Sequence, residues 1–394
     1  MKSAVIHRKK LEPILRRHPW IFSGAIHWRD PDLQDGDWVT VLDEHKQQLG
    51  YGHFHKGSIA VKMISFGPEA YQESIWDDKF NAAWNLRQTL GLTVSKVTNC
   101  FRLIHGEADG LPGLIVDIYS DLAVVQCHTI GMFKNLQHIQ AALLQISGGD
   151  VIHHIILKSK DCLPADFAKD VRDGILYGDK TNLEVIENGH RFQVNILESQ
   201  KTGLFLDQRE NRQLLAQIAE NKCVLNTFCY TGGFSIYAGN AGASEVWSVD
   251  ASAKAIEMLG INIKLNLQNE NQHQVKHMQI NDFWKEVPKD YFDIIILDPP
   301  AFAKNKEHRH QAIQAYKRLN LMAMQLLKKG GILMSFSCSQ VVTEDIFYHT
   351  CVAAGIESGR DLLLLRKMSQ GQDHPVSLFH PEGSYLKGLM FYVR

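Results

Sequence analysis

The chain has 394 residues and a formal net charge of −1 at pH 7, which excludes a single small domain and a uniformly basic nucleic-acid-packing protein. The sequence contains no apolar run of the ~20 residues needed to span a membrane, and bases at 8–10 interrupt the start before a signal segment could form. The seven cysteines are scattered without a C-x-x-C pair, which argues against a disulfide framework or a metal site and predicts a cytoplasmic protein.

Residues 1–68 are predicted to form a small β-rich domain. Short alternating runs at 38–42, 49–54 and 59–64 are separated by turns, a spacing typical of a compact barrel. The first 20 residues carry six bases against the single acid Glu12, so we predict contacts with RNA phosphates. The residues expected to make them are Arg8, Lys9, Arg16 and Arg17. A solvated terminal face is the alternative interpretation of these charges.

Trp20 and Phe22 alternate with polar and basic residues, as aromatic side chains do on RNA-binding surfaces. They are also two residues apart, which is the period of a strand. We therefore expect at least one of them to lie in the core of the domain.

Residues 69–180 are predicted to form a central α+β domain. Helical periodicity covers 76–90 and 133–146, and strands are expected at 101–104, 114–118, 122–128 and 152–158. Glu107 and Asp109 are separated by one residue and could act as a carboxylate pair. Because glycines flank them at 106, 110 and 113, they are expected to be turn formers instead.

Residues 181–394 alternate between helical and apolar strand patterns, which predicts an α/β fold with a parallel or mostly parallel sheet of the Rossmann-like kind. An Asn188-Gly189 hairpin precedes this alternation. The expected helices are 208–220, 233–241, 252–267, 311–328 and 343–355, and the expected strands are 223–228, 245–249, 275–280, 292–297, 331–336 and 361–366. A last hairpin is expected around 381–383, before a closing strand at 389–393.

A glycine loop follows the strand at 223–228, and the next strand ends in Asp250, where a nucleotide-binding sheet places the acid that holds a ribose. The loop lacks the G-x-G-x-x-G pattern of a pyrophosphate site, so it fits an adenosine without phosphates, most commonly S-adenosylmethionine. Asp282 is expected at the adenine amino group, and Phe283 is expected to stack on the ring. The full set of predicted cofactor-binding residues is Phe228, Tyr230, Thr231, Gly232, Gly233, Asp250, Asp282, Phe283, Asp207 and Arg209; for Asp207, a helix N-cap is the alternative.

Two further predicted strands end at residues that could take part in catalysis. Asp298 ends the apolar run at 294–297 and is followed by two prolines, which stiffen a turn at the sheet edge where ligands bind. Cys338, between two serines, ends another strand at the same edge, where a thiol could attack C6 of a pyrimidine. An inert core cysteine is the alternative. Further RNA contacts are expected from Lys201 and from the basic loop containing Lys304, Lys306 and Arg309.

Across nearly its whole length the chain resembles the bacterial large-subunit ribosomal RNA methyltransferases of the methyltransferase I type, which methylate cytosine C5 in 23S ribosomal RNA. The matching stretches are Arg17 to Gly24, Gly106 to Gly113, Lys201 to Gly203, Asp207 to Arg209, Phe228 to Phe234, Asp298 to Pro300, Ser337 to Ser339, Asp373 to Pro375 and Pro381 to Gly383. The resemblance implies an RNA-binding PUA domain, a small central domain and a C-terminal Rossmann-like methyltransferase domain. It also implies S-adenosylmethionine as methyl donor and Cys338 as nucleophile.

One position departs from the wider group of cytosine-C5 enzymes. Many of those that act on RNA have a second cysteine after the Asp-Pro-Pro-like turn, which expels the C5 proton, whereas this chain has Ala301. The base that removes this proton is therefore unassigned.

Two alternatives stay open at this stage. One is methylation of an exocyclic amino group of guanine or adenine, with Asp298 as acceptor and Cys338 structural. The other is a non-catalytic RNA-binding ribosome-assembly factor. The sequence leaves the target nucleotide, the assembly stage of the ribosomal RNA substrate and the choice between monomer and homodimer undecided.

Overall fold

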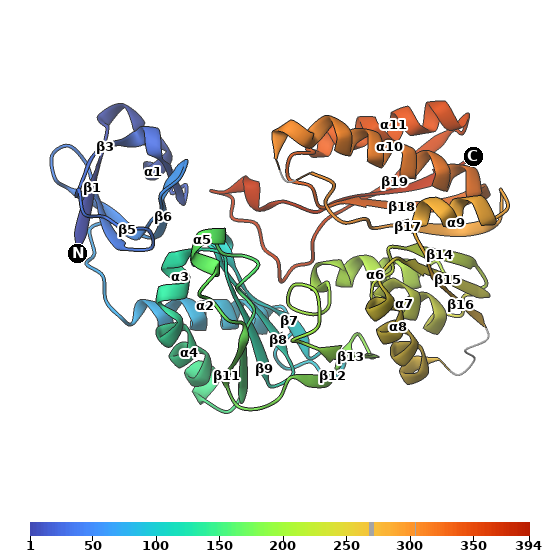
Figure 1. The fold of residues 1–394 in the computed structure, drawn as a ribbon, viewed down its shortest axis with the longest axis horizontal. Helices are drawn as coiled ribbons and strands as arrows, with labels where there is room; N and C mark the ends of the chain where they lie inside the picture. The colour runs from blue at the N-terminus through green and yellow to red at the C-terminus, as the bar shows by residue number, and fades with distance from the viewer. Residues whose placement is uncertain (268–271, 304) are drawn as a thin grey trace. The chain divides into compact units, whose positions relative to one another are not determined.

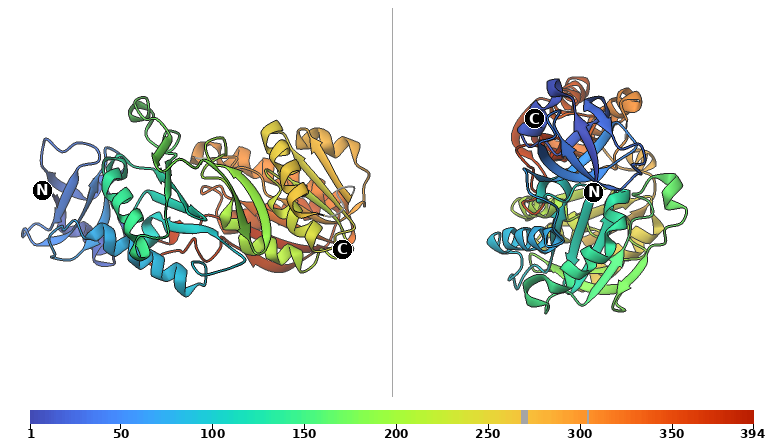
Figure 2. Two further views of the ribbon diagram at one scale, coloured as in Figure 1. Left: turned by 90° about the horizontal axis from the view of Figure 1, so that it is seen from below. Right: turned by 90° about the vertical axis from the view of Figure 1, so that its left-hand side faces the viewer.

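The computed structural model describes residues 1–267, 272–303 and 305–394 (Figures 1 and 2). The chain divides into two separately packed units. The first consists of Met1–Val185, Val194–Gly203 and Gln372–Gly383. The second consists of Ile186–Gln193, Leu204–Gly371 and Ser384–Arg394, and it holds the sheet that carries the candidate active site.

The N-terminal part of the first unit is a six-stranded sheet in the order β2-β6-β5-β4-β1-β3, which curls around its own core (Figure 1). Its strands are β1 (Lys2–Ile6), β2 (Trp20–Phe22), β3 (Ile26–Arg29), β4 (Trp38–Leu42), β5 (Gln48–Phe54) and β6 (Ile59–Phe66). Strand alternation points Val39 and Val41 of β4 inward, where both are completely buried. The predicted β-rich N-terminal domain is confirmed.

The same alternation decides the positions of the aromatic residues in β2. Ile21 is the residue that faces the core, while Trp20 is half-buried and Phe22 is 52% exposed. The expectation that Trp20 or Phe22 is a core residue is therefore wrong, because the residue between them takes the inward position.

The central part of the first unit is a five-stranded sheet in the order β11-β10-β9-β8-β7. Its strands are β7 (Cys100–His105), β8 (Leu114–Tyr119), β9 (Leu122–Cys127), β10 (His154–Leu157) and β11 (Gly174–Tyr177), and its helices are α2 (Ile75–Thr89), α3 (Ile130–Lys134), α4 (Leu136–Gln145) and α5 (Ala165–Ala168). Glu107 and Asp109 lie in a single 3-10 turn and pair with different cations. Asp109 accepts two hydrogen bonds from the buried Arg87, at 2.5 and 2.9 Å, and Glu107 accepts one from Lys62 at 3.2 Å.

The predicted Asn188-Gly189 hairpin joins β12 (Asn182–Glu187) to β13 (His190–Asn195). Both turn residues have positive φ angles, 50° and 84°, as the tight turns that match strand twist require. Asparagine and glycine adopt this conformation at low cost, which is why the sequence signal was reliable.

The second unit contains a seven-stranded sheet in the order β16-β15-β14-β17-β18-β20-β19. Its strands are β14 (Cys223–Thr227), β15 (Glu245–Asp250), β16 (His273–His277), β17 (Phe292–Leu297), β18 (Leu327–Ser337), β19 (Leu362–Met368) and β20 (Lys387–Val393). The strand pairs β16-β15, β15-β14, β14-β17 and β17-β18 are parallel. Strand β20 runs antiparallel to both of its neighbours, β18 and β19. The predicted mostly parallel Rossmann-like sheet is confirmed.

Helices cover both faces of this sheet (Figures 1 and 2). They are α6 (Arg209–Ala216), α7 (Gly233–Asn240), α8 (Ala253–Asn266), α9 (Ile280–Glu286), α10 (Arg309–Leu326) and α11 (Glu344–Ser358). Within β17, Ile295 and Leu297 pack with the cluster formed by α9, α10 and α11, whereas Ile294 and Ile296 pack with the cluster of α6 and α7. Burial on both faces explains why these strands read as continuous apolar runs.

Two parts of the second sheet differ from the expectation. Residues 280–286 form the helix α9, although only a strand end and a loop were expected there. The spacing of Ile280, Phe283 and Trp284 is that of a helix face, and all three are buried. In addition, no tight hairpin joins β19 to β20: residues 369–386 connect them, and Gln372–Gly383 packs with the first unit.

Separate clusters of buried side chains lie in the N-terminal, central and C-terminal parts of the chain. Because Ile64 of β6 belongs to the central cluster and both parts fall in the first unit, the division at about residues 68 and 180 stays a prediction. Among the described residues, no helix is both long and apolar enough to cross a membrane.

Candidate active site

Four elements of the second unit bring polar residues to one edge of its sheet. Strands β14, β15, β17 and β18 are parallel, so the residues that follow them share the carboxyl edge. Asp250 ends β15, Asp298 follows β17 and Cys338 follows β18. Because β20 is antiparallel, its first residue, Lys387, lies at this edge too and pairs with Ser337. The change in strand order between β15-β14 and β17 is where nucleotide-binding sheets open a crevice.

The glycine loop after β14 has a strained backbone. Phe228, Tyr230 and Gly232 have φ angles of 53°, 48° and 88°, and non-glycine residues rarely adopt positive values. Such strain is concentrated at ligand sites, where the surrounding structure holds the backbone in place. Here Asp250 does so, because its two carboxylate oxygens accept backbone hydrogen bonds from Tyr230 at 2.9 Å and Ser252 at 2.8 Å.

A buried ion pair lies behind the same loop. Arg212 of α6 donates two hydrogen bonds to Glu187, at 2.8 and 2.7 Å, and the side chains are 5% and 0% exposed. The Tyr237 hydroxyl donates a third to Glu187 at 3.0 Å. A Cβ atom on Gly233 would lie 3.1 Å from the Arg212 side chain, so the helix begins in direct contact with this pair.

Asp298 is held by a chain of amide side chains. Gln208 donates to its Oδ2 atom at 3.0 Å, and Asn211 donates to the Gln208 carbonyl at 2.6 Å. Both amides are buried, whereas Asp298 is half-buried. Gln208 therefore helps to orient a carboxylate that is only half-buried.

Cys338 is also half-buried and packs on the α6 and α7 side of the sheet, whereas Tyr316 of α10 lies on the other side. The Tyr316 hydroxyl is 3.1 Å from the hydroxyl of Ser339. Burial raises the pKa of Tyr316, and the charges of Cys338 and Asp298 raise it further, while the hydroxyls of Ser337 and Ser339 lower it. Asp298 and Cys338 follow the neighbouring parallel strands β17 and β18, so both lie at the same edge of the sheet.

The other cysteines differ from Cys338 in their surroundings. All seven are among the described residues, and none forms a disulfide. Burial raises the pKa of the Cys127 and Cys223 thiols to about 12, and it also raises the pKa of Cys229 and Cys351. Thiols with raised pKa values are poor nucleophiles at neutral pH, so these cysteines are structural. Cys162, the other half-buried cysteine, belongs to the first unit.

Three predicted cofactor residues have positions that change their interpretation. The Phe283 ring is 1% exposed and packs in the core beside Trp247 and Trp284, so the stacking role predicted for it does not fit. Asp282 is on the outer side of the same helix, 58% exposed and paired with Lys285 at 2.8 Å. Asp207 is not a helix N-cap, because the α6 cap is Gln208; its carboxylate accepts a 2.5 Å hydrogen bond from the Tyr385 hydroxyl.

Arg209 begins α6 and is 3% exposed, with its guanidinium 3.5 Å from Glu210. The contact of this buried side chain with the cofactor stays a prediction. Thr231 is nearly buried, and its carbonyl accepts from Asn262 of α8 at 2.9 Å.

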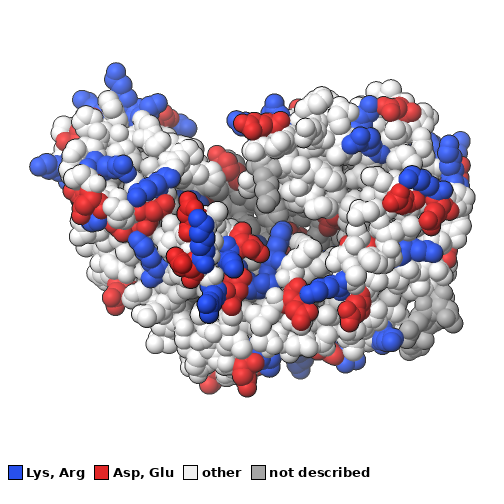
Figure 3. Space-filling view, in the orientation of Figure 1, with Lys and Arg blue, Asp and Glu red and all other residues white. Residues whose placement is uncertain are grey.

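The predicted RNA-contacting bases of the N-terminal part lie on the surface, where Figure 3 shows lysine and arginine side chains projecting. Arg8, Lys9, Arg16 and Arg17 are all exposed, and Arg16 pairs with Glu12 at 2.9 Å. An open cavity of ≈ 450 Å³ lies on the same domain. It is lined by aromatic and basic side chains that include Trp28, Arg29, His55 and Lys56.

The remaining predicted RNA contacts are divided between the units. Lys201 is exposed in the first unit, beside the buried Thr202, whose hydroxyl donates to Asp117 at 2.6 Å. Lys306 and Arg309 are exposed where α10 begins. Lys304 lies outside the described residues.

Comparison with known proteins agrees with this geometry. A family model of S-adenosylmethionine-dependent methyltransferases matches residues 113–358, and one of PUA-like domains matches residues 5–66. Ribosomal RNA large subunit methyltransferase I of Aeromonas hydrophila is 36% identical over 393 residues, which cover 97% of this chain and 96% of the relative. The protein of the same name from Tolumonas auensis is 34% identical, and the match covers 98% of each chain.

The chain belongs to this methyltransferase family.

Solved structures agree with the fold. A protein from Streptococcus mutans matches all of this chain and all of its own, with a TM-score of 0.84 at 22% identity. A second match, determined in complex with S-adenosylhomocysteine, has a TM-score of 0.83 at 23% identity over the whole of both chains. At these identities the structures support the fold alone.

The residues at the sheet edge fit the cofactor of the family. Each Asp250 carboxylate oxygen accepts one backbone hydrogen bond, one from Tyr230 and the other from Ser252. A carboxylate has about four acceptor positions, so positions remain for the two ribose hydroxyls. The strained backbone at 228–232 is already in a conformation that a bound ligand would otherwise have to impose. S-adenosylmethionine supplies an electrophilic methyl group when it is bound at such an edge. Its contacts with individual residues stay predictions.

Substitution of Gly232 by alanine is expected to weaken S-adenosylmethionine binding about tenfold or more, which corresponds to about 1.4 kcal/mol. A Cβ there would lie 2.2 Å from Leu259 Cδ1, and φ is +88°, so the loop has to move. Calorimetric titration with the cofactor measures the effect. Gly260→Ala is the matched control, because this neighbour of Leu259 has open space around its Cβ position and should bind normally. Unchanged affinity in G232A would mean that the loop does not hold the cofactor.

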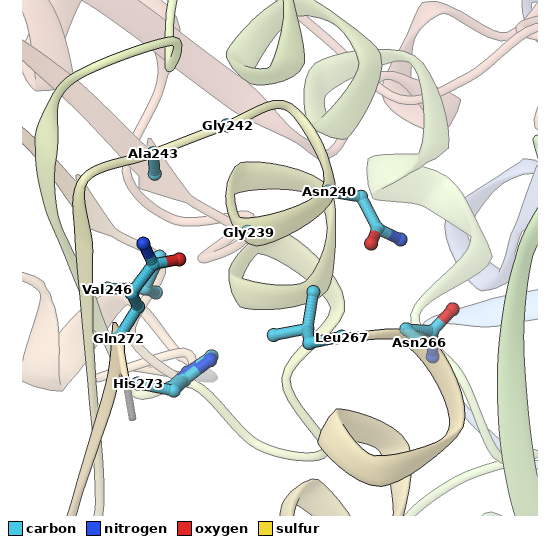
Figure 4. A pocket seen from close by; sticks show the side chains of 9 residues that line it. All are labelled: Gly239, Asn240, Gly242, Ala243, Val246, Asn266, Leu267, Gln272 and His273. Atoms are coloured by element: carbon cyan, nitrogen blue, oxygen red, sulfur yellow. The ribbon is translucent and has the colours of Figure 1, made fainter. Parts of the chain in front are cut away.

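A cavity of ≈ 360 Å³ lies at the opposite edge of the sheet (Figure 4). It is formed where α7 and α8 end and where β15 and β16 begin, and Asn240, Asn266 and His273 are among its lining residues. Because Asp250 is at the other end of β15, this cavity is separate from the candidate active site.

Only one group of potential metal ligands comes together among the described residues. His7, His27 and Glu44 place one ligand atom each within 4.8 Å of one another, all on the exposed surface of the N-terminal part. None of the three lies at the sheet edge.

Sequence reasoning missed several residues of the site. Gln208 and Asn211 reach Asp298, and Tyr316 and Lys387 reach Ser339 beside Cys338, only through the packing of α6, α10 and β20 on the sheet. Lys387 lies two residues before the closing strand that was expected at 389–393, and β20 begins with it. A lysine at the first position of an apolar strand was the one signal that could have drawn attention to it.

Proposed function

We propose that the protein methylates C5 of a cytosine in 23S ribosomal RNA, with Cys338 adding to C6 of the base. The observation that carries this proposal is the position of Cys338: a half-buried thiol at the carboxyl edge of the sheet, after the strand that neighbours the one followed by Asp298. The relatives that match 97–98% of the chain are named for methylation of large-subunit ribosomal RNA. The PUA-like domain and the exposed bases around it support an RNA substrate.

The proposed chemistry begins at the thiolate. The Cys338 sulfur forms a bond to C6, and the electron pair of the C5–C6 double bond moves to C5, which becomes nucleophilic toward the methyl donor. After methylation, the C5 proton leaves to a base, the pair from the C5–H bond re-forms the double bond, and the S–C6 bond breaks to restore the thiolate. Asp298 is proposed to hold the base at N3 or N4, and the buried Gln208 keeps its carboxylate oriented.

Methylation of an exocyclic amino group is the second candidate. Asp298, followed by Pro299 and Pro300, could accept from an amino group of guanine or adenine without help from a thiol. Under that alternative Cys338 would have no chemical role. Its half-buried position at the sheet edge that it shares with Asp298 is the feature that favours C5 methylation.

Ribosomal RNA containing 5-fluorocytosine separates the two reactions. With the C5 route, the fluorine cannot leave as a cation, so the protein is expected to stay covalently attached to the RNA through Cys338. Denaturing gels and peptide mass spectrometry detect the adduct. Methylated product without any adduct would contradict the C5 proposal and support amino methylation. Mass mapping of 23S ribosomal RNA from a deletion strain then identifies the nucleotide.

A further inference from the structure

The open cavity of ≈ 450 Å³ on the N-terminal domain is built by two elements that are distant in the sheet order. Strand β3 supplies one wall, and the turn between β5 and β6 supplies another. Strand β3 pairs with β1, so only the curl of the sheet brings it to the β5–β6 turn. The volume lies within the usual range for sites that bind a small organic group, about 300–1,000 Å³.

The walls of this cavity are positively charged. Arg29 and Lys56 line it, and none of its lining residues in the described part of the chain is an aspartate or a glutamate. Among the described residues, neither of these two cations forms an ion pair; the Lys56 ammonium donates to the Gln34 side chain at 3.0 Å. Arg29 and Lys56 are both exposed, so they are available to a phosphate group.

Trp28 gives the cavity an exposed aromatic face. It is 49% exposed, although tryptophan is highly buried on average. The guanidinium carbon of Arg29 lies 4.8 Å from the centre of the buried Phe54 ring, a cation–π contact that holds the cation against the domain. An exposed ring for stacking and a cation for the backbone are the two features that sites for single-stranded RNA combine.

His55 adds a polar group without a partner. Its Nδ1 atom faces Asp35 at 3.4 Å, and the other oxygen of that carboxylate accepts from the Lys56 backbone at 3.4 Å, so Asp35 holds the turn in place. The Nε2 atom is buried and has no hydrogen-bond partner among the described residues. Because buried polar atoms nearly always have a partner, this atom indicates that a polar ligand completes the cavity.

We propose that this cavity holds one unpaired nucleotide of the ribosomal RNA substrate, with its base stacked on Trp28 and its phosphate against Arg29 and Lys56. This inference rests on the proposed function, because it takes the RNA substrate from there. None of these three residues was expected from the sequence to contact RNA, since β3 and the β5–β6 turn meet only in the folded domain.

The test is the affinity of the full-length protein for an unmodified 23S ribosomal RNA transcript, measured by filter binding without S-adenosylmethionine. Trp28→Ala should weaken binding about fivefold or more, the scale of one base stacked on an aromatic ring. Trp28→Phe keeps a ring and should recover most of the affinity. Both variants should fold, because Trp28 is exposed and pairs with β1 through its backbone.

Lys56→Gln tests the phosphate contact. Removal of one such contact should weaken binding and reduce the slope of log affinity against log salt concentration by about 1. Lys46→Gln is the matched control, because Lys46 is an exposed lysine in the β4–β5 turn of the same domain and does not line the cavity. It should leave both the affinity and the slope unchanged.

Crosslinking locates the nucleotide directly. Irradiation of the wild type with a transcript that contains 4-thiouridine, followed by peptide mass spectrometry, should find RNA attached within residues 26–29 or 55–57. Unchanged affinity in Trp28→Ala, or crosslinks that all lie outside these two segments, would overturn the proposal.

Failure of the proposed function would look different. If the wild type does not bind the transcript at all, the RNA substrate itself is rejected. Weaker binding in Trp28→Ala together with a missing 5-fluorocytosine adduct would support the nucleotide site and reject only the C5 reaction.

Discussion

Replacement of Cys338 by alanine is expected to reduce methyl transfer to ribosomal RNA at least about a thousandfold, the usual scale for loss of a covalent nucleophile. The thiol is a half-buried group at the same edge as Asp298, and the pathway through C6 has no substitute for it. Transfer of a radiolabelled methyl group to 23S ribosomal RNA measures the loss.

Cofactor binding should be nearly unchanged in the same variant. Asp250 and the glycine loop hold their geometry through contacts with Tyr230 and Ser252, not with Cys338. Calorimetric titration with S-adenosylmethionine therefore shows whether the variant is folded. Cys162→Ala is the matched control, because it removes the other half-buried thiol from the first unit and should keep full activity. Full activity in Cys338→Ala would reject the covalent mechanism and leave amino methylation as the better explanation.

Replacement of Glu187 by alanine is expected to destabilise the second unit by about 3–5 kcal/mol, because it leaves the buried Arg212 without its partner. Burial lowers the pKa of Arg212, but the charge of Glu187 outweighs that effect and raises it, so the guanidinium remains charged at every accessible pH. The loss of stability in Glu187→Ala should therefore be the same at pH 6 and pH 9.

Hydrogen exchange of β14, β15 and β17 in increasing urea measures this loss in the second unit alone, which global unfolding of a chain with two units cannot do. Lys367→Gln breaks an ion pair whose side chains are 64% and 57% exposed and should cost less than about 1 kcal/mol. A double replacement, Glu187→Leu with Arg212→Met, should recover most of the stability, since no charge is then left buried. If hydrogen-exchange protection in Glu187→Ala equals that of the wild type, Arg212 must form hydrogen bonds with water or with another group in the variant.

Elements with strong local signals were predictable from the sequence. The hairpin at Asn188-Gly189 and the buried strand ending at Asp298 each depend on neighbouring residues and the backbone they prefer, so they formed where expected. Phe283 shows the limit of that approach. Its position after a strand suggested a ligand contact, but its spacing with Ile280 and Trp284 forms a helix that buries the ring.

The sequence by itself determined the order of strands and helices, the glycine loop with its acid, and the two strand ends that carry Asp298 and Cys338. These features are local, because each is set by a residue and a few neighbours along the chain. Tertiary structure alone decided what surrounds the thiol. Tyr316 comes from a helix and Lys387 from an antiparallel strand that pairs with β18 across 50 residues of chain. Such pairing depends on register and packing between distant segments, which no local pattern records, and it is this pairing that brings Lys387 to the sheet edge where Cys338 lies.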